Sequence, residues 1–309
     1  MNQKKNRSTK VSNQIVKPVF QIVFFIHSSS KMETFHMRIK ILLATWLGLI
    51  GITASAFEGA ATIGARSAGL GRASVALSDF WSVHNNPAGM ALRQQTEAGV
   101  YYENRFMMKE LSLKSAAFVL PVKFGVLGLS FNQFGFSLFN ENKLGLAYAR
   151  SFGDYLRLGV QLDYLSTRFG EGYESADNVT FEAGVQSNLN EKMVIGAWIF
   201  NPVKAKLSSY TDERVPLIMR FGILYNFTDR FSGTAEVEKQ SDRKNDLRAG
   251  LEYALTNTFF ARLGLSTNPE MLTFGTGMDF GRLQLDIAAS MHQVLGVSFQ
   301  SGISYQFGK

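Results

Sequence analysis

Hydrophobic and polar residues alternate along the last segment of the chain, from Val297 to Phe307. Odd positions there are apolar or aromatic except Ser301, and even positions hold serine, glutamine or glycine. Because successive side chains of a strand point to opposite faces, this segment has one apolar and one polar face. The pattern recurs along the chain in segments of about ten residues, the length of a tilted strand that crosses a bilayer. It predicts a transmembrane β-barrel.

Fourteen such segments follow residue 94, and an even number suits a closed antiparallel barrel without an exposed edge. The predicted strands are 95–104, 112–120, 124–133, 142–151, 155–168, 178–189, 192–200, 217–227, 231–239, 246–255, 258–267, 271–280, 282–291 and 297–307. The predicted fold class is therefore all-β, a transmembrane antiparallel β-barrel of about 14 strands.

The connections between these strands are expected to alternate in length. Every second one is a tight turn, at Pro121-Val122, Gly153-Asp154, Asn190-Glu191, Thr228-Asp229, Thr256-Asn257 and Gly281. The others are longer or more polar, such as 169–177, 201–216 and 240–245. Short periplasmic turns opposite longer outer loops are typical of outer-membrane barrels. Aromatic residues beside the tight turns, among them Phe152, Tyr155 and Phe227, predict a girdle at the periplasmic interface.

Strand parity assigns charged residues to the inside of the barrel. Sets such as Leu156-Leu158-Val160-Leu162 are predicted to face lipid, which places the polar residues between them in the lumen. The candidate lumen network consists of Arg157, Asp163, Arg220, Glu236, Arg248, Glu252, Arg262 and Asp286. Acids and bases are balanced, so we expect ion pairs. Such pairs either fill and rigidify the barrel or line a permeation path or ligand site.

The first 56 residues predict an export signal. Arg38 and Lys40 precede an apolar run over 41–52 and the small-residue site Ala54-Ser55-Ala56, so 37–56 is predicted to be a signal peptide. Residues 1–36 fit no export signal and are expected to be an extension from a misplaced start codon. Residues 1–56 contain eight Lys/Arg and one Glu, so they carry the whole net charge of +7. The mature chain therefore has no excess positive charge that would favour nucleic acid.

The segment between the signal peptide and the barrel, 57–93, is predicted to fold into the lumen as a plug or hatch on the periplasmic side. It is rich in glycine and small residues and contains Asn85, Asn86, Pro87, Ala88 and Gly89. Glycines permit close packing and tight bends, and Pro87 disfavours helical geometry at the residue before it. The barrel domain then spans 94–309.

The runs ARSAGLGRASVA and NNPAGMA resemble the N-terminal region of the FadL-like outer-membrane proteins, in which an Asn-Pro-Ala motif precedes the barrel. This resemblance implies fourteen strands, an N-terminal hatch and transport of hydrophobic compounds. In size and in the ARSAGLG…NNPAGMA run, the chain is most similar to the PorV/PorQ branch, which implies a role in type IX protein secretion. Two features depart from the family: the outer loops are short, and the chain ends Gly308-Lys309 rather than on an aromatic residue.

The sequence offers no catalytic or metal-binding pattern. It lacks cysteine, has no Gly-x-Ser-x-Gly elbow, and retains only His84 and His292 after residue 56. We therefore expect no enzyme, no cofactor and no metal site. The first functional hypothesis is an outer-membrane barrel of a Gram-negative bacterium that docks secretion machinery or cargo, especially through 201–216. The alternatives are a FadL-like passive transporter of a small hydrophobic ligand and a purely structural barrel. Outer-membrane lipid is the expected partner in each case.

Overall fold

The structure is a computed structural model that describes residues 60–170, 175–205, 214–241 and 243–308. The predicted leader (1–36) and signal peptide (37–56) lie outside these residues, and so do the first three residues of the predicted plug.

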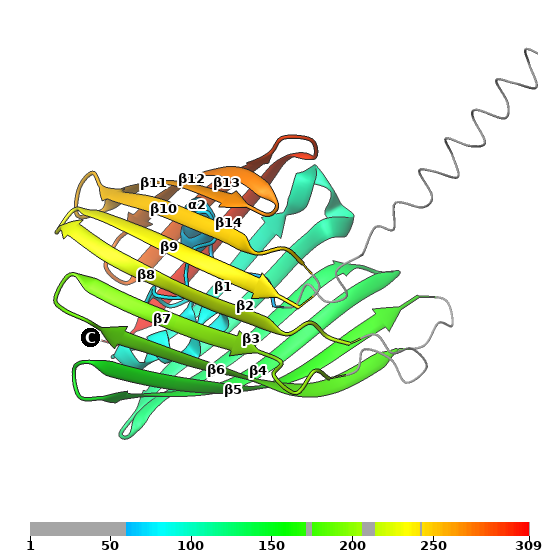
Figure 1. Ribbon diagram of the computed structural model, residues 1–309, viewed down its shortest axis with the longest axis horizontal. Coiled ribbons are helices and arrows are strands. Elements are labelled where there is room, and N and C mark those ends of the chain that lie inside the picture. The colour runs from blue at the N-terminus through cyan, green and yellow to red at the C-terminus, as the bar shows by residue number, and fades with distance from the viewer. Residues whose placement is uncertain (1–59, 171–174, 206–213, 242, 309) are drawn as a thin grey trace, which may run out of the picture. The chain divides into compact units, whose positions relative to one another are not determined.

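Fourteen antiparallel strands form one closed barrel, in which each strand pairs with its sequence neighbours and β1 pairs with β14 (Figure 1). The strands are β1 (Thr96–Asn104), β2 (Ser112–Val122), β3 (Gly125–Phe136), β4 (Phe139–Phe152), β5 (Leu156–Phe169), β6 (Ala176–Asn188), β7 (Met193–Phe200), β8 (Ile218–Thr228), β9 (Phe231–Gln240), β10 (Asp246–Ala254), β11 (Phe259–Thr267), β12 (Glu270–Asp279), β13 (Leu283–His292) and β14 (Gly296–Phe307). The predicted fold class and strand number are confirmed.

Helices are short and form no part of the barrel wall. Among the described residues, three precede the barrel and two connect its first strands: α2 (Ala65–Gly69), α3 (Ser82–Asn85), η1 (Pro87–Leu92), η2 (Arg105–Met107) and η3 (Lys109–Leu111). Within the described part of the chain, no helix has the length and apolar character needed to cross a membrane.

The register brings both ends of the barrel sequence to one rim. Thr96, the first residue of β1, lies opposite Phe307, the last residue of β14. We call this rim the inner end, because the sequence predicts that it faces the periplasm, and the opposite rim the outer end. Exposed aromatic residues, including Phe152, Tyr155 and Phe227, lie beside the tight turns of the inner end.

The connections at the outer end differ from the prediction. The β3–β4 connection is only Ser137-Leu138 and the β11–β12 connection is only Asn268-Pro269, so loop lengths do not alternate around the whole barrel. At the inner end, the tight turn predicted around Pro121-Val122 lies two residues later, because both of these residues belong to β2 and Pro121 pairs with Val126. A proline near the end of a strand removes one N–H donor without creating a turn.

The two faces of the wall have the predicted polarity. On β5, Leu158 and Leu162 are 42% and 57% exposed, whereas Arg157 and Asp163 on the opposite face are 2% and 0% exposed. Apolar side chains are exposed in the same way on other strands, which is the surface that a hydrocarbon environment requires. The lumen face instead contains most of the buried charges of the described residues.

A closed barrel of this kind leaves no unpaired strand edge, so its unfolding must break the whole ladder at once. We therefore expect the detergent-folded protein to stay compact in SDS at room temperature and to unfold only on heating. Gel mobility before and after boiling checks this expectation. A circular-dichroism spectrum dominated by helix would contradict the fold.

Candidate functional site

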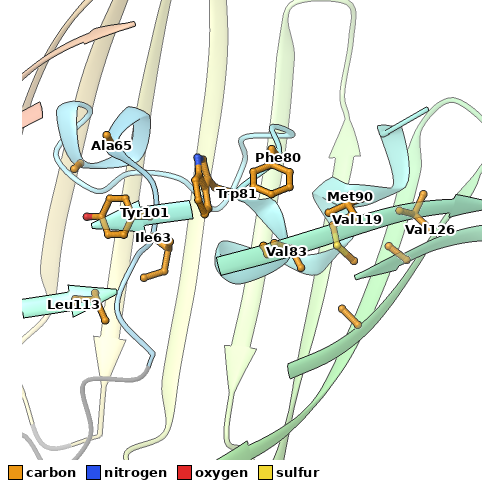
Figure 2. Packing of buried hydrophobic residues seen from close by; sticks show 14 of the residues in the cluster. Ile63, Ala65, Phe80, Trp81, Val83, Met90, Tyr101, Leu113, Val119 and Val126 are labelled. Carbon is orange, nitrogen blue, oxygen red and sulfur yellow. The ribbon is translucent and has the colours of Figure 1, made fainter. Parts of the chain in front are cut away.

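Residues 60–92 pack against the lumen face of the barrel, with most of their side chains buried. Figure 2 shows Phe80, Trp81 and Val83 of this segment beside Tyr101 of β1 and Val119 of β2. The Trp81 ring makes edge contacts with Phe80 and Tyr101, at centroid distances of 4.8 and 5.9 Å.

Apolar side chains on the lumen faces of β2 and β3 pack against the segment. Leu113, Val119, Val126 and Phe134 belong to one buried cluster with Ile63, Trp81 and Met90 of the segment. Complete burial of such a side chain stabilises a fold by roughly 1.5–3 kcal/mol. The apolar residues on both faces of β2 and β3 thus serve lipid contact on one side and this packing on the other.

Inward-facing glycines let the segment approach the wall closely. We name the following residues the glycine belt: Gly99, Gly128, Gly159, Gly184, Gly196, Gly222, Gly250 and Gly264. A Cβ atom placed on Gly250 would lie 2.6 Å from the carbonyl oxygen of Leu70, and one on Gly99 would lie 2.5 Å from Phe80. Neither distance is compatible with a real side chain, so the Leu70 backbone and the Phe80 ring rest directly on the strands.

The NNPAG run fastens the segment to itself and to the wall. Asn85 accepts a hydrogen bond from the Ile63 N–H (2.9 Å) and donates one to the Ile63 carbonyl (2.8 Å). Asn86, in extended geometry before Pro87, accepts from the Ala88 N–H (3.2 Å), which caps η1. Its amide donates to the Val75 carbonyl at 2.7 Å. These residues act in packing and capping, and the structure assigns no ligand contact to them.

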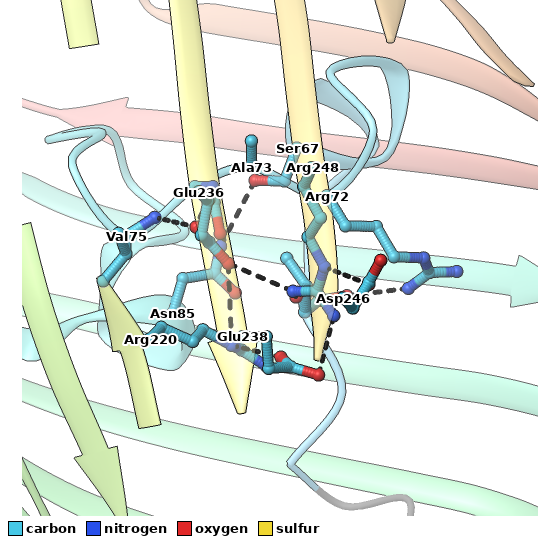
Figure 3. A network of polar contacts seen from close by, with 12 residues as sticks. Ser67, Arg72, Ala73, Val75, Asn85, Arg220, Glu236, Glu238, Asp246 and Arg248 are labelled. Atoms are coloured by element: carbon cyan, nitrogen blue, oxygen red, sulfur yellow. Dashed lines mark hydrogen bonds and ion pairs between the residues drawn. The ribbon is translucent and has the colours of Figure 1, made fainter. Parts of the chain in front are cut away.

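The strongest polar anchor of the segment is Glu236 on β9 (Figure 3). One carboxylate oxygen accepts the backbone N–H groups of both Ser74 and Val75, each at 2.7 Å. The other oxygen pairs with Arg248 at 3.1 Å and lies 3.8 Å from Arg220. Without Glu236, these two buried donors would lose the acceptor that they share.

Glu238 lies one inward position farther along β9 and faces the same two arginines. It pairs with Arg220 at 2.6 Å and with Arg248 at 2.8 Å, while Asp246 binds the Nε of Arg248 at 2.7 Å. Glu238 thus accepts from arginine side chains of the wall, whereas Glu236 also accepts from the backbone of the segment. This difference makes Glu238 a matched counterpart of Glu236.

A second polar group joins the segment to β10, β11 and β13. Arg66 of α2 bonds Glu252 at 2.7 Å and Asp79 at 3.3 Å. Arg262 bridges Glu252 and Asp286, at 2.6 Å to each. Of the predicted network residues, Glu252, Arg262 and Asp286 are therefore brought together here.

The remaining two predicted residues lie elsewhere. Asp163 lies 3.9 Å from Lys143, which also pairs with Glu182, and Arg157 donates to Ser78 and Asn188. The predicted network is thus several separate groups. Sequence reasoning did not single out Lys143 or Glu182, although their inward positions could have been found from strand parity.

Two cavities lie on the polar side of the lumen, along β8, β9 and β10. The outer chamber, about 250 Å³, lies at the outer ends of these strands between Arg220, Arg248 and Arg72. The inner chamber, about 700 Å³, lies near their inner ends and is lined by Arg66, Glu252 and other residues. Between them, residues 70–75 rest on Gly222, Thr234 and Gly250. We call residues 70–75 the barrier strip.

The two histidines have structural roles. His84 is buried and stacks on Trp81 at 6.0 Å, and burial together with the Lys143 ammonium lowers its pKa to about 3. Its ring is therefore neutral at ordinary pH. The Nδ1 of His292 accepts the N–H groups of Val294 and Leu295 in the β13–β14 turn. Among the residues that the structure describes, no three His, Asp or Glu side chains are grouped to hold a metal.

Comparisons in sequence find no relative: no protein-family model matches the chain, and no curated protein matches it. Solved structures do match. The Pseudomonas putida toluene transporter TodX aligns with a TM-score of 0.60 at 13% identity, covering 79% of this chain and 97% of that chain. The Ralstonia pickettii toluene transporter TbuX gives 0.60 at 14% identity, with 79% and 97% covered. A Pseudomonas aeruginosa FadL homologue gives 0.58 at 14% identity, with 78% and 98% covered.

At these identities the likeness establishes the fold. This chain has the architecture of a FadL-type outer-membrane β-barrel, and two of the neighbours, TodX and TbuX, are toluene transporters. The predicted resemblance to FadL-like barrels is confirmed at the level of fold, and the finer assignment to the PorV/PorQ branch stays a prediction.

Proposed function

We propose that this protein is an outer-membrane barrel for the passive transport of small hydrophobic or amphipathic compounds, with residues 60–92 as the closed gate. The observation that carries the proposal is the pair of chambers separated by the barrier strip. Solutes that reach the outer chamber would pass toward the inner end once this strip moved away from the wall. The transporters TodX and TbuX have the same fold, which supports transport over the other hypotheses.

A second feature supports a gate rather than a permanent filling. The polar attachments of the barrier strip are separate hydrogen bonds to wall side chains, among them Glu236, Gln186, Thr273 and Glu103, rather than a continuous backbone ladder. Breaking a small number of bonds would therefore release the strip while the barrel ladder stays intact.

Planar-bilayer conductance of the protein with and without residues 57–90 tests the proposal. We expect the intact protein to be silent and the deletion to form a steady pore. Heat-dependent gel mobility must first show that the deletion variant has folded. Steady conductance by the intact protein would exclude a closed gate, and a folded but silent deletion variant would show that the segment is not the barrier.

The secretion hypothesis rests on the size of the chain and on the ARSAGLG…NNPAGMA run. The region proposed for docking, 201–216, lies partly outside the described residues, since 206–213 are not described. We keep docking of secretion machinery as a second hypothesis. Co-purification of secretion components with the full-length protein, lost on replacement of residues 201–216, would favour it over transport.

A further inference from the structure

His84 lies inside the contact between the N-terminal segment and the barrel wall. It belongs to the short helix α3 and its residue is 2% exposed. Its ring stacks on Trp81, with 6.0 Å between the ring centres and 30° between the planes. The adjacent Val83 belongs to the apolar cluster of Figure 2, which joins the segment to β2 and β3. The imidazole is therefore shielded from water as long as the segment stays on the wall.

The ring of His84 is poorly suited to carry a proton in this position. Neither of its nitrogens makes a hydrogen bond with a described residue, whereas the side chains of Asn85 and Asn86 are hydrogen-bonded. A neutral imidazole has one donor and one acceptor, and an imidazolium has two donors and a positive charge. Burial of a charge without a partner costs far more than burial of a neutral polar group. The seated segment therefore holds His84 in its neutral form.

The charges around the ring do not offset this cost. Lys143 of β4 acts on the ring, and its ammonium opposes a second positive charge, whereas the Ala116 carbonyl of β2 favours protonation less strongly. β3 and η1, which pack against α3, contain no ionisable residue. Glu141, the other ionisable residue on the lumen face of β4, lies one inward position nearer the outer end.

Carboxylates on the surrounding elements are already paired with cations. The pairs are Glu182 and Asp163 with Lys143, Glu97 with Arg93, Glu103 with Arg72, and Asp79 with Arg66. None of these ion pairs includes the His84 ring. Protonation of His84 in place would thus add an uncompensated charge to the packed segment.

Release of the segment would remove this penalty, because His84 would then be in water. Its pKa would rise from about 3 in the seated segment to the ordinary value of about 6.5. The released state binds a proton at a pH where the seated state does not, so a fall in pH favours release. Above pH 6.5 the seating is unaffected. Below it, the ratio of released to seated segment rises by about tenfold per pH unit, which gives about thirtyfold at pH 5.

We propose that His84 makes the seating of residues 60–92 sensitive to acid, so that protonation of its ring in a mildly acidic medium releases the segment from the wall. As regulation of the gate this rests on the proposed function, but as a property of the seating it stands independently. Unperturbed carboxylates titrate near pH 4, so a response between pH 5 and 6.5 belongs to a histidine. The other described histidine, His292, belongs to the β13–β14 turn and not to the segment.

Hydrogen exchange followed by mass spectrometry tests the proposal on the full-length protein folded in detergent. Exchange of the amides in 80–90 is measured from about pH 7.5 to 4.5 and divided by the rate of an unstructured peptide of the same sequence, which gives an opening constant. We expect this constant to begin rising near pH 6.5 and to be about thirtyfold higher at pH 5 than at pH 7.5. Amides of the barrel strands should show no such rise, because the ladder stays closed.

His84→Phe and His84→Leu remove the ring nitrogens and leave an apolar side chain of similar size in the same place. In either variant the opening constant should not change between pH 7.5 and 5. His292→Gln is the matched control, since it removes the other described histidine, and it should respond to acid like the wild type. Two replacements of His84 are used because one of them can pack less well against Trp81.

Three outcomes would overturn the proposal. The first is an opening constant of the wild type that does not change with pH, and the second is a rise that begins only below about pH 4.5, which would assign release to carboxylates. Both are read from the wild type alone, so they do not depend on the folding of a variant. The third is an undiminished response in a His84 variant. Because exchange measures seating and not conductance, its failure leaves the conductance test unaffected, and a failed conductance test leaves this response in place.

Discussion

Replacing Glu236 with alanine is expected to turn a silent barrel into one that opens frequently. The change removes the acceptor of the Ser74 and Val75 N–H groups, which hold the barrier strip to β9. Leaving buried donors unpaired costs roughly 1–3 kcal/mol each. Since every 1.4 kcal/mol is a factor of ten in an equilibrium constant, the open population should rise by about tenfold or more. Single-channel recording in planar bilayers measures this directly as opening frequency.

Glu238→Ala is the control for this variant. Glu238 faces the same arginines, Arg220 and Arg248, from the same strand, but it accepts from their side chains rather than from the backbone of the strip. Both variants remove one carboxylate from the same group of charges, so a general electrostatic effect would appear in both. Openings confined to Glu236→Ala identify the bonds to the strip as the latch. Equal behaviour of the two variants would contradict this assignment.

Much of the barrel could be predicted because strand structure is encoded locally. Alternation of apolar and polar residues has period two whatever a strand pairs with, so the predicted strand 271–280 differs from β12 (Glu270–Asp279) by one residue at each end. Parity likewise placed Arg262 and Asp286 in the lumen, where they pair at 2.6 Å. A one-residue error in register would have turned both to the lipid.

Contacts of the N-terminal segment could not be predicted in the same way. Arg66 meets Glu252 across 186 positions of sequence, and no periodic signal connects a short helix to a particular strand. The lengths of the connections at the outer end were not predicted correctly either. Ser137-Leu138 and Asn268-Pro269 connect strands directly, since turn residues reveal where a strand stops but less well how long the connection is.

The glycine belt was present in the sequence and was overlooked. Glycine is neutral in a scan for hydrophobic alternation, so its inward positions carried no weight in assigning strands. Gly159 of β5 lies opposite Gly184 of β6, and Gly250 of β10 lies opposite Gly264 of β11. Glycine within a strand often marks the close approach of another backbone. Adjacent inward-facing glycines would therefore have predicted that another segment of the chain lies against the lumen face of these strands.

Replacing Gly250 with leucine should unseat the N-terminal segment while the barrel still folds. The new Cβ would lie 2.6 to 2.7 Å from the carbonyl oxygen, Cα and Cβ of Leu70. Overpacking of an interior costs typically about 1–3 kcal/mol, and the upper part of this range applies because backbone atoms cannot rotate away. Displacement of residues 69–75 would expose Arg66 and Arg72, so we expect rapid cleavage of the folded variant by trypsin near the N-terminus.

Ala249→Leu is the matched control, because it adds nearly the same group one residue earlier on the other face of β10. Ala249 lines an apolar depression of about 410 Å³ on the lipid-facing surface of the barrel, beside Leu251 and Leu263. A leucine side chain has room and apolar neighbours there. This variant should resist trypsin like the wild type and stay silent in bilayers. Gly250→Leu should be both cleaved and conducting, because a single displacement exposes the arginines and opens the strip. Cleavage without conductance would mean that the segment can leave the wall without opening a path through the lumen. In that case the segment would not be the gate.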